Sequence, residues 1–358
     1  MVIKQIQLAN FRNYEKQNLM LEKGINIFYG DNAQGKTNLL EAIFVCAIGK
    51  SFRTNKEREM INFQHKEASL DVSFEKRDRE GTIGLELGEK KRFLLNGIPL
   101  KKTSQVLGNI YVVLFTPDDI AILKEGPAGR RRFLDIMISQ LRPSYMRFLS
   151  EYNKTMIQRN HYLKQIKTEN KPVDMLDIWD EKLTQLGNKI YEYRLEFVKK
   201  ISDKLDKIHH TITDNREDIS ISYVSVFDKK TDFKEKLKEC RNMDMIRGYT
   251  SVGIHKDDFK VEINGKPISS YGSQGQHRTA ILSLKIAELE LIYDEVGEYP
   301  ILLLDDFMSE LDVQRRMNLL QNMKNNQVII TCTDYAFFED MNANFFEVNK
   351  GKITKRTK

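Results

Sequence analysis

The segment Gly30-Asp31-Asn32-Ala33-Gln34-Gly35-Lys36-Thr37 constrains this chain more than any other part of its sequence. It fills every fixed position of the phosphate-loop pattern G-x-x-x-x-G-K-[ST]. An apolar run at 25–29 precedes it and a helical stretch at 38–48 follows it, so a strand, a loop and a helix are expected in that order. Such a loop holds nucleotide phosphates with backbone N–H groups and the positive end of the helix dipole. Lys36 is expected at the β- and γ-phosphates and Thr37 at Mg²⁺, whereas the alternative is a glycine turn before an ordinary helix.

Composition limits the class of protein. A chain of 358 residues suggests about two domains or lobes. Its formal charge of +6 suits an anionic partner without establishing one. The 3 cysteines are far apart, which argues against a disulfide framework or a zinc site and favours a reducing, cytoplasmic setting. The sequence shows neither a membrane-spanning apolar run nor a signal-peptide core.

Hydrophobic periodicity predicts an α/β fold with a helical insertion. Strand-like alternation dominates the first third, and helices alternate with strands in the last third. Between them, apolar residues recur at helical spacing in two stripes, from Phe148 to Ile166 and from Trp179 to Ile212, with a break at Lys171-Pro172. Two helices folding back as a hairpin explain this pattern. We therefore expect one lobe, which carries the phosphate loop, at residues 1–116, a mainly helical lobe at 117–245, and the rest of the first lobe at 246–358.

Two further segments complete the pattern of a nucleotide site. The run Pro300–Leu304 is apolar and ends in Asp305 and Asp306, the form of a Walker B strand. Asp305 is expected to hold Mg²⁺ and Asp306 to orient or deprotonate the attacking water, whereas the alternative is a buried strand that ends in a helix cap. The glycine-rich segment 271–278 precedes a long helical stretch, so Ser273, Gly275 and Gln276 are expected to form a second anion-binding platform.

Together these motifs resemble the head of an SMC-type ATP-binding-cassette ATPase without long coiled-coil arms, and more narrowly the RecF family of recombination mediators. The resemblance covers nearly the whole chain. It rests on the phosphate loop and on these further segments: Phe11-Arg12-Asn13-Tyr14, Ser51-Phe52-Arg53-Thr54, the Gly126–Asp135 run, Ser273-Gln274-Gly275-Gln276, Leu303-Leu304-Asp305-Asp306, Ser309-Glu310-Leu311-Asp312 and Thr331-Cys332-Thr333-Asp334.

The resemblance implies that ATP is held between two copies of the chain. Lys36 and Thr37 of one copy would bind it, while Ser273 and Gly275 of the other would cap its γ-phosphate. Hydrolysis would be slow and regulatory. Most cassette ATPases carry glutamate where this chain has Asp306 and many carry a histidine near Thr331. A threonine, Thr331 or Thr333, would then replace that histidine.

The resemblance also implies duplex or gapped DNA as a ligand, RecR and RecO as partners, and a role in loading RecA onto strands coated with SSB. Candidate DNA contacts are Lys50, Arg53, Lys56, Arg130 and Arg131, each of which is alternatively an ordinary solvated charge. A small-molecule P-loop kinase and a transporter-type ATPase subunit are the alternative functions. The first predicts no signature segment, the name used here for Ser273-Gln274-Gly275-Gln276. The second predicts a shorter insertion and the fuller sequence L-S-G-G-Q.

Overall fold

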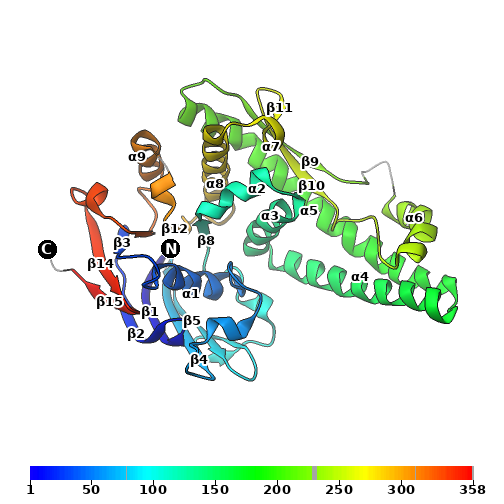
Figure 1. Cartoon of the computed structure of the whole chain (residues 1–358), viewed down its shortest axis with the longest axis horizontal. Coiled ribbons are helices and arrows are strands. Elements are labelled where there is room, and N and C mark those ends of the chain that lie inside the picture. Colours follow the sequence, from blue (N-terminus) through cyan, green and yellow to red (C-terminus); the bar gives the residue numbers. More distant parts are fainter. Residues whose placement is uncertain (78, 228–231, 311, 357–358) are drawn as a thin grey trace. The chain divides into compact units, whose positions relative to one another are not determined.

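The computed structural model describes residues 1–77, 79–227, 232–310 and 312–356, so Leu311 of the Ser309–Asp312 segment lies outside the described residues. The chain divides into two compact units (Figure 1). The first unit consists of Met1–Ile120 together with Arg278–Lys358, and the second of Ala121–His277. The second unit therefore continues beyond the helical lobe expected at 117–245, because the strands that follow α5 (Leu176–Thr213) pair within it.

A largely parallel sheet carries the phosphate loop in the first unit. Its strands are, in spatial order, β15 (Lys352–Lys355), β14 (Ala343–Asn349), β3 (Ile25–Tyr29), β13 (Val328–Cys332), β12 (Ile301–Asp305) and β8 (Val112–Phe115). β15 runs antiparallel to β14, and the remaining neighbours pair in parallel. Every residue of β12 and β13 is buried, which explains why both strands read as continuous apolar runs rather than alternating ones.

The second sheet of this unit is antiparallel. Its strands are, in spatial order, β2 (Tyr14–Met20), β1 (Val2–Phe11), β4 (Ala68–Lys76), β5 (Arg79–Leu87), β6 (Arg92–Leu95) and β7 (Ile98–Pro99). The first helix, α1 (Lys36–Ile48), contacts strands of both sheets. Because α1 packs on two sides, it is buried almost all round and shows no single apolar stripe.

The remaining described elements of the first unit are short or peripheral. The helix α8 (Gln274–Val296) begins at the end of the second unit and continues into the first. The others are α9 (Val313–Asn322) and 3-10 turns at Glu57–Met60, Thr103–Gln105, Pro117–Asp119, Phe307–Glu310 and Ala336–Phe338. The short helix α2 (Ile120–Lys124) begins at Ile120 and otherwise belongs to the second unit.

The second unit is built on a helical hairpin. The long helices α4 (Pro143–Glu169) and α5 lie side by side in Figure 1, and Asn170 ends α4 in the left-handed conformation, with φ 53°. At 38 residues, α5 spans about 57 Å. The other described elements are α3 (Pro127–Leu141), α6 (Phe233–Arg247), α7 (Ile268–Tyr271), a 3-10 turn at Val173–Met175, and a sheet of β9 (Ile219–Val224), β10 (Asp258–Ile263) and β11 (Lys266–Pro267).

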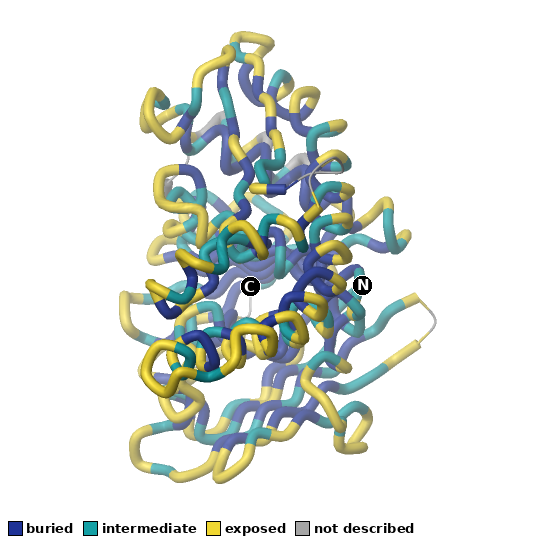
Figure 2. The backbone as a smooth tube through the Cα atoms, turned by 90° about the vertical axis from the view of Figure 1, so that its right-hand side faces the viewer, coloured by how far each residue is buried: buried dark blue, intermediate teal, exposed yellow. Residues whose placement is uncertain are grey.

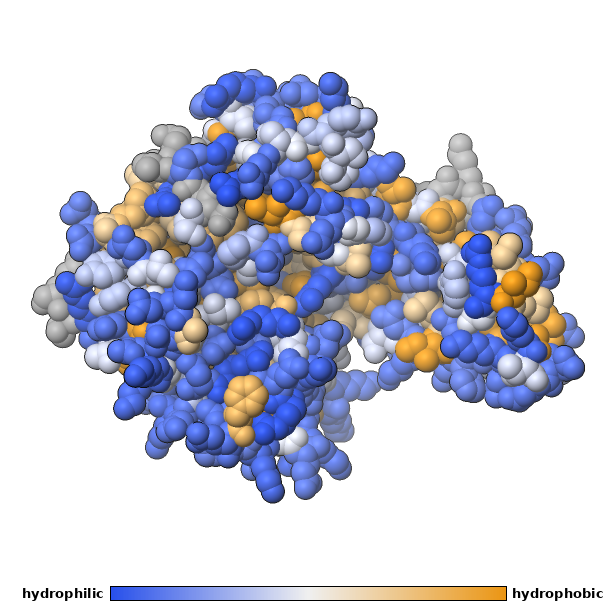
Figure 3. Space-filling model, viewed as in Figure 1, coloured by the Kyte–Doolittle hydropathy of each residue, from blue (hydrophilic) through white to orange (hydrophobic). Residues whose placement is uncertain are grey.

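Buried and exposed residues separate as expected for a folded domain. Figure 2 shows buried segments along the inner strands and helix faces, with exposed positions gathered in turns. Figure 3 shows a surface that is mostly hydrophilic, with scattered apolar atoms. None of the helices in the described ranges is long and apolar enough to cross a membrane.

A buried arginine joins three helices of the second unit. The Arg159 side chain, from α4, is fully buried and bonds Asp180 of α5 at 2.6 Å and Asp244 of α6 at 2.7 Å. Removing one member of such a network leaves unpaired charge in the interior, which destabilises more than the loss of an exposed pair.

We therefore expect Arg159→Ala to lower the free energy of unfolding by about 3–5 kcal/mol, because two buried carboxylates lose their shared partner. Chemical denaturation followed by circular dichroism measures the change. The matched control is Arg216→Ala, whose exposed guanidinium pairs with Asp214 and whose loss costs at most about 1 kcal/mol. Equal stabilities of the two variants would contradict a supporting role for the buried network.

Candidate nucleotide-binding site

The phosphate loop connects β3 to α1 and adopts a conformation that needs glycine at two positions. Gly30 has φ 149° and Gly35 has φ 119°. A Cβ atom on Gly30 would lie 2.3 Å from the carbonyl oxygen of Val348, and one on Gly35 would lie 2.6 Å from Asn13 Nδ2. Both positions therefore exclude a side chain, for steric as well as conformational reasons.

The Lys36 ammonium group lies inside this loop. Its Nζ donates hydrogen bonds to the carbonyl oxygens of Gly30 at 2.6 Å and Asp31 at 2.9 Å, and the residue is only 5% exposed. The loop thus holds a buried positive charge beside the N-terminus of α1, where an anion is stabilised by both.

Thr37 and Asp305 meet although 268 positions separate them in the sequence. The Thr37 hydroxyl donates to Asp305 Oδ1 at 2.8 Å. Adjacent oxygen ligands of an octahedral Mg²⁺ with bonds of about 2.1 Å lie about 3 Å apart, so this pair fits the edge of such a coordination sphere. Burial raises the pKa of Asp305, while the hydrogen bonds from Thr37 and Thr331 lower it. The pair offers the hard oxygen ligands that Mg²⁺ prefers.

Asp306 leaves β12 in a strained conformation beside this pair. Its φ is 47°, an uncommon value for a residue with a side chain. Its N–H donates to Thr331 Oγ1 at 3.0 Å. Burial raises the pKa of the Asp306 carboxyl, and the positive charge of Lys36 lowers it. A raised pKa brings a carboxylate closer to the range in which it accepts a proton from water near neutral pH.

A small cavity adjoins the Asp306 side chain. Its volume is about 170 Å³, and its lining includes Asp306, Ser309, Arg316, Cys332 and Thr333. It has room for several waters.

The two threonines at the end of β13, Thr331 and Thr333, have different surroundings. Thr331 is fully buried, and its hydroxyl donates to Asp305 Oδ1 at 2.9 Å. Thr333 is exposed and lines the cavity beside Asp306. Thr331 thus contacts both aspartates, and both threonines line the cavity beside Asp306. No feature of the sequence indicated that Thr331 contacts Asp305.

Two asparagines that the sequence did not single out as site residues support the loop. Asn13 Nδ2 donates to the carbonyl oxygen of Gln34 at 2.7 Å, and Asn38 Nδ2 donates to Asn13 Oδ1 at 2.8 Å. Arg53 Nη1 in turn donates to Asn38 Oδ1 at 2.6 Å. This chain of hydrogen bonds connects Arg53 to the phosphate loop. In the sequence, only the Phe11–Tyr14 motif pointed to this part of the site, and it assigned no role to Asn13.

The candidate DNA contacts have different environments. Lys50, Arg53 and Lys56 are exposed. Arg130 instead makes a bidentate pair with Asp258, at 2.6 and 2.9 Å, so its charge is already neutralised within the second unit. Arg131 is partly buried and donates to the carbonyl oxygen of Asp257. Lys50, Arg53 and Lys56 thus expose more of their side chains than Arg130 and Arg131 do, and two of them also face carboxylates, with Arg53 Nη1 at 3.6 Å from Glu41 Oε2 and Lys56 Nζ at 3.4 Å from Glu59 Oε1.

The segment Ser273–Gln276 forms a capping box at the start of α8. The N–H of Gln276 donates to Ser273 Oγ at 3.2 Å, and the N–H of Ser273 donates to Gln276 Oε1 at 2.8 Å. Ser273, Gln274 and Gly275 are exposed. Because Ser273 Oγ accepts within the box, its proton is available for donation to an anion at the helix N-terminus.

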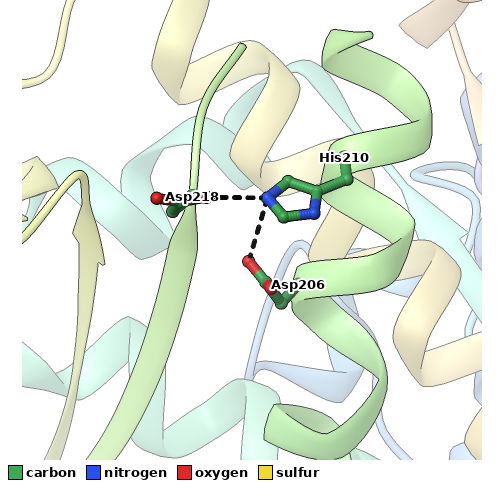
Figure 4. Close-up of side chains that lie close together, drawn as sticks. All are labelled: Asp206, His210 and Asp218. Atoms are coloured by element: carbon green, nitrogen blue, oxygen red, sulfur yellow. Dashed lines mark hydrogen bonds and ion pairs between the residues drawn. The ribbon is translucent and has the colours of Figure 1, made fainter. Parts of the chain in front are cut away.

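Another group of ligand-type side chains lies at the junction of α5 and β9 (Figure 4). His210 Nε2 lies 2.8 Å from Asp218 Oδ1 and 3.6 Å from Asp206 Oδ1, and both carboxylates are exposed. The contacts of His210 with the two carboxylates join the end of α5 to the beginning of β9.

The comparisons with known proteins agree with this geometry. The family model described as "RecF/RecN/SMC N terminal domain" matches residues 2–355. The chain is similar to the DNA replication and repair protein RecF of Acetivibrio thermocellus, with 44% identity over 353 residues that cover 96% of each chain. It is also similar to the RecF of Alkaliphilus oremlandii, with 46% identity over 367 residues covering 99% of this chain and all of that protein.

Solved structures confirm the predicted fold class. The structure of "the recombination mediator protein RecF-ATP in RecFOR pathway" matches with a TM-score of 0.93 and 38% identity, over 99% of this chain and 97% of that one. An SMC head domain from Pyrococcus furiosus matches with a TM-score of 0.57 and 16% identity, over 99% of this chain and 96% of that one. The latter similarity concerns the fold alone.

The position of Thr331 generates a prediction. We expect Thr331→Val to weaken Mg²⁺-dependent ATP binding about tenfold, because Asp305 loses a donor and the Asp306 N–H loses its acceptor in a buried setting. Isothermal titration with and without Mg²⁺ measures the change. The matched control, Thr155→Val, removes another buried hydroxyl, from α4 in the second unit, and should keep the Mg²⁺-dependent affinity. Unchanged binding by the Thr331 variant would show that the hydroxyl does not orient the carboxylates.

Proposed function

The chain belongs to the RecF family, and from this membership we propose that it is an ATP-dependent, DNA-binding recombination mediator that acts as a homodimer. The observation that carries the proposal is the Thr37–Asp305 hydrogen bond beside the buried Lys36 ammonium group. It supports an ATP and Mg²⁺ site of the Walker type, as does the structural relative described with ATP. RecF membership over residues 2–355 leaves a small-molecule kinase or a transporter subunit without support.

In this proposal each residue has a defined task. The loop from Gly30 to Thr37, namely Gly30, Asp31, Asn32, Ala33, Gln34, Gly35, Lys36 and Thr37, cradles the phosphates, and Lys36 neutralises their charge. Thr37 and Asp305 would hold Mg²⁺, which when bound withdraws charge from the β- and γ-phosphates. Asp306 orients the attacking water and accepts its proton in the adjoining cavity. Hydrolysis is slow and regulatory, and it ends the ATP-bound state.

The other half of the site comes from a second copy. Ser273 and Gly275 are exposed at the positive end of α8. Groups that contact a ligand bound to another molecule need such exposure. The γ-phosphate would lie between this helix end and the phosphate loop of the partner copy. Because each copy supplies both halves, the contact is self-complementary and closes as a twofold dimer. Loss of the γ-phosphate removes the shared ligand and releases the dimer.

DNA is the proposed ligand of the ATP-bound dimer. Arg53, Lys50 and Lys56 are exposed on the segment after α1 and would contact phosphates, so binding is tolerant of sequence and sensitive to salt. The hydrogen-bond chain from Arg53 to Gln34 provides a route by which DNA and nucleotide sense each other. RecR and RecO are the proposed partners at gapped DNA, and RecA loading in place of SSB is the outcome. Under this proposal the protein acts in DNA repair and DNA replication.

The composite site predicts an effect of Ser273→Arg on assembly. We expect ATP to convert the wild type to a dimer, and the variant to stay monomeric while it still binds ATP, because a bulky cation replaces the phosphate-facing hydroxyl. Sedimentation analysis with ATP, with ADP and without nucleotide measures this. Ser220→Arg, at an exposed position of β9, is the control and should dimerise normally. A wild type that binds ATP but stays monomeric would overturn the composite site.

The DNA surface predicts that Arg53→Glu weakens duplex binding much more than ATP binding. The slope of log K against log salt should decrease by about 1 for the lost phosphate contact. Fluorescence anisotropy with labelled duplex at several salt concentrations gives this slope. Arg92→Glu changes an equally exposed arginine on the antiparallel sheet and serves as the control for net charge. Equal losses in both variants would argue for a general charge effect instead.

A further inference from the structure

The capping box at Ser273 depends on the orientation of one amide group. Gln276 Oε1 must face the Ser273 N–H, because the opposite orientation would place an NH₂ group against a backbone donor. An asparagine or glutamine amide has no intrinsic preference between these orientations. Its other partner therefore decides which one is populated.

That partner is Glu217. Gln276 Nε2 donates to Glu217 Oε1 at 2.9 Å. A carboxylate accepts hydrogen bonds and donates none, so it holds the NH₂ group of Gln276 on its own side. The carbonyl oxygen of the amide must then face Ser273. One carboxylate thus determines the geometry of the box from 59 positions away in the sequence.

Glu217 lies at the junction of α5 and β9, beside a buried histidine. Its Oε2 lies 3.5 Å from Nε2 of His209, whose side chain is fully buried. Burial lowers the pKa of His209, which favours the neutral imidazole there. The next residue, Asp218, exchanges hydrogen bonds with Asn264 at 2.9 Å and pairs with His210 (Figure 4). The two hydrogen bonds of the Asp218 backbone fix the chain next to Glu217, so its carboxylate meets Gln276 from a fixed position.

We propose that Glu217 is a positioning residue for the signature segment, which sets the Gln276 amide and through it presents Ser273 to the γ-phosphate of ATP. The proposal rests on the function proposed above. It gives Gln276 an indirect role, since both polar groups of its amide are used within the chain. Glu217 touches no nucleotide. It connects the end of the long helix α5 to the signature, so a change at that junction reaches the ATP site.

The charge and hydrogen-bonding capacity of residue 217 predict an order of effects. Glu217→Gln keeps an acceptor oxygen and should retain most activity. Glu217→Ala removes the acceptor and should lower kcat for ATP hydrolysis about fivefold with little change in KM, because ATP first binds the phosphate loop. Glu217→Lys presents only donors, turns the amide round, and should be the most impaired.

A double-mutant cycle separates this role from general destabilisation. In the Gln276→Ala background, Glu217→Ala should have no further effect on kcat, because the group that it positions is gone. Asp218→Asn is the matched control, since it alters the same junction without contacting Gln276, and it should hydrolyse ATP at the wild-type rate. Additive effects of Glu217→Ala and Gln276→Ala, or an equal loss in Asp218→Asn, would overturn the proposal.

Hydrogen exchange tests the proposal without relying on dimerisation or hydrolysis. In nucleotide-free protein, Glu217→Ala should speed exchange of the amides at 273–277 about fivefold, and Asp218→Asn should leave them unchanged. Unchanged exchange in the alanine variant would refute the positioning role. If exchange responds as expected while ATP leaves the wild type monomeric, the positioning role stands and the composite site fails.

Discussion

The hydrogen bond between Thr37 and Asp305 requires two segments that are far apart in the sequence to lie side by side, and the strand order of the first unit brings them together. The two residues follow β3 and end β12, which lie on either side of β13. Parallel strands bring their carboxyl ends to the same edge of the sheet, which is where α/β folds bind ligands. The intervening strand contributes Thr331, whose hydroxyl contacts Asp305 and receives the N–H of Asp306. Sheet order therefore assembles the Mg²⁺ ligands and the candidate base from distant segments.

The phosphate loop is also held from outside by two turns. Asn13, between β1 and β2, and Gly351, between β14 and β15, both donate to the carbonyl oxygen of Gln34, at 2.7 and 3.1 Å. A Cβ on Gly351 would lie 2.2 Å from the carbonyl oxygen of Asn13, so the two turns approach each other as closely as a glycine allows. The loop is thus fixed before a ligand arrives, which lowers the entropic cost of binding.

Local patterns predicted the parts of this site that depend on neighbours in sequence. The phosphate loop, the apolar strand before Asp305 and the serine at the start of α8 are each recognisable within about ten residues. Partners such as Asn13, Thr331 and Glu217 are ordinary residues until the fold brings them to Gln34, Asp305 and Gln276. Likewise, the charge of Arg130 suggested DNA, but only the structure pairs it with Asp258. Contacts between distant segments carry no local signature, which is why sequence reasoning missed them.

The backbone gives a reason for the aspartate at position 306. With φ 47°, residue 306 turns the chain out of β12 directly after Asp305, and its N–H is held by Thr331. Asparagine and aspartate tolerate this left-handed conformation better than residues with longer side chains. A glutamate at this position would adopt the left-handed conformation less readily, and its carboxylate would lie one methylene further from the backbone. The shorter carboxylate and the left-handed turn therefore belong together, and a replacement that lengthens the side chain alone would not reproduce the geometry of ATPases that carry glutamate.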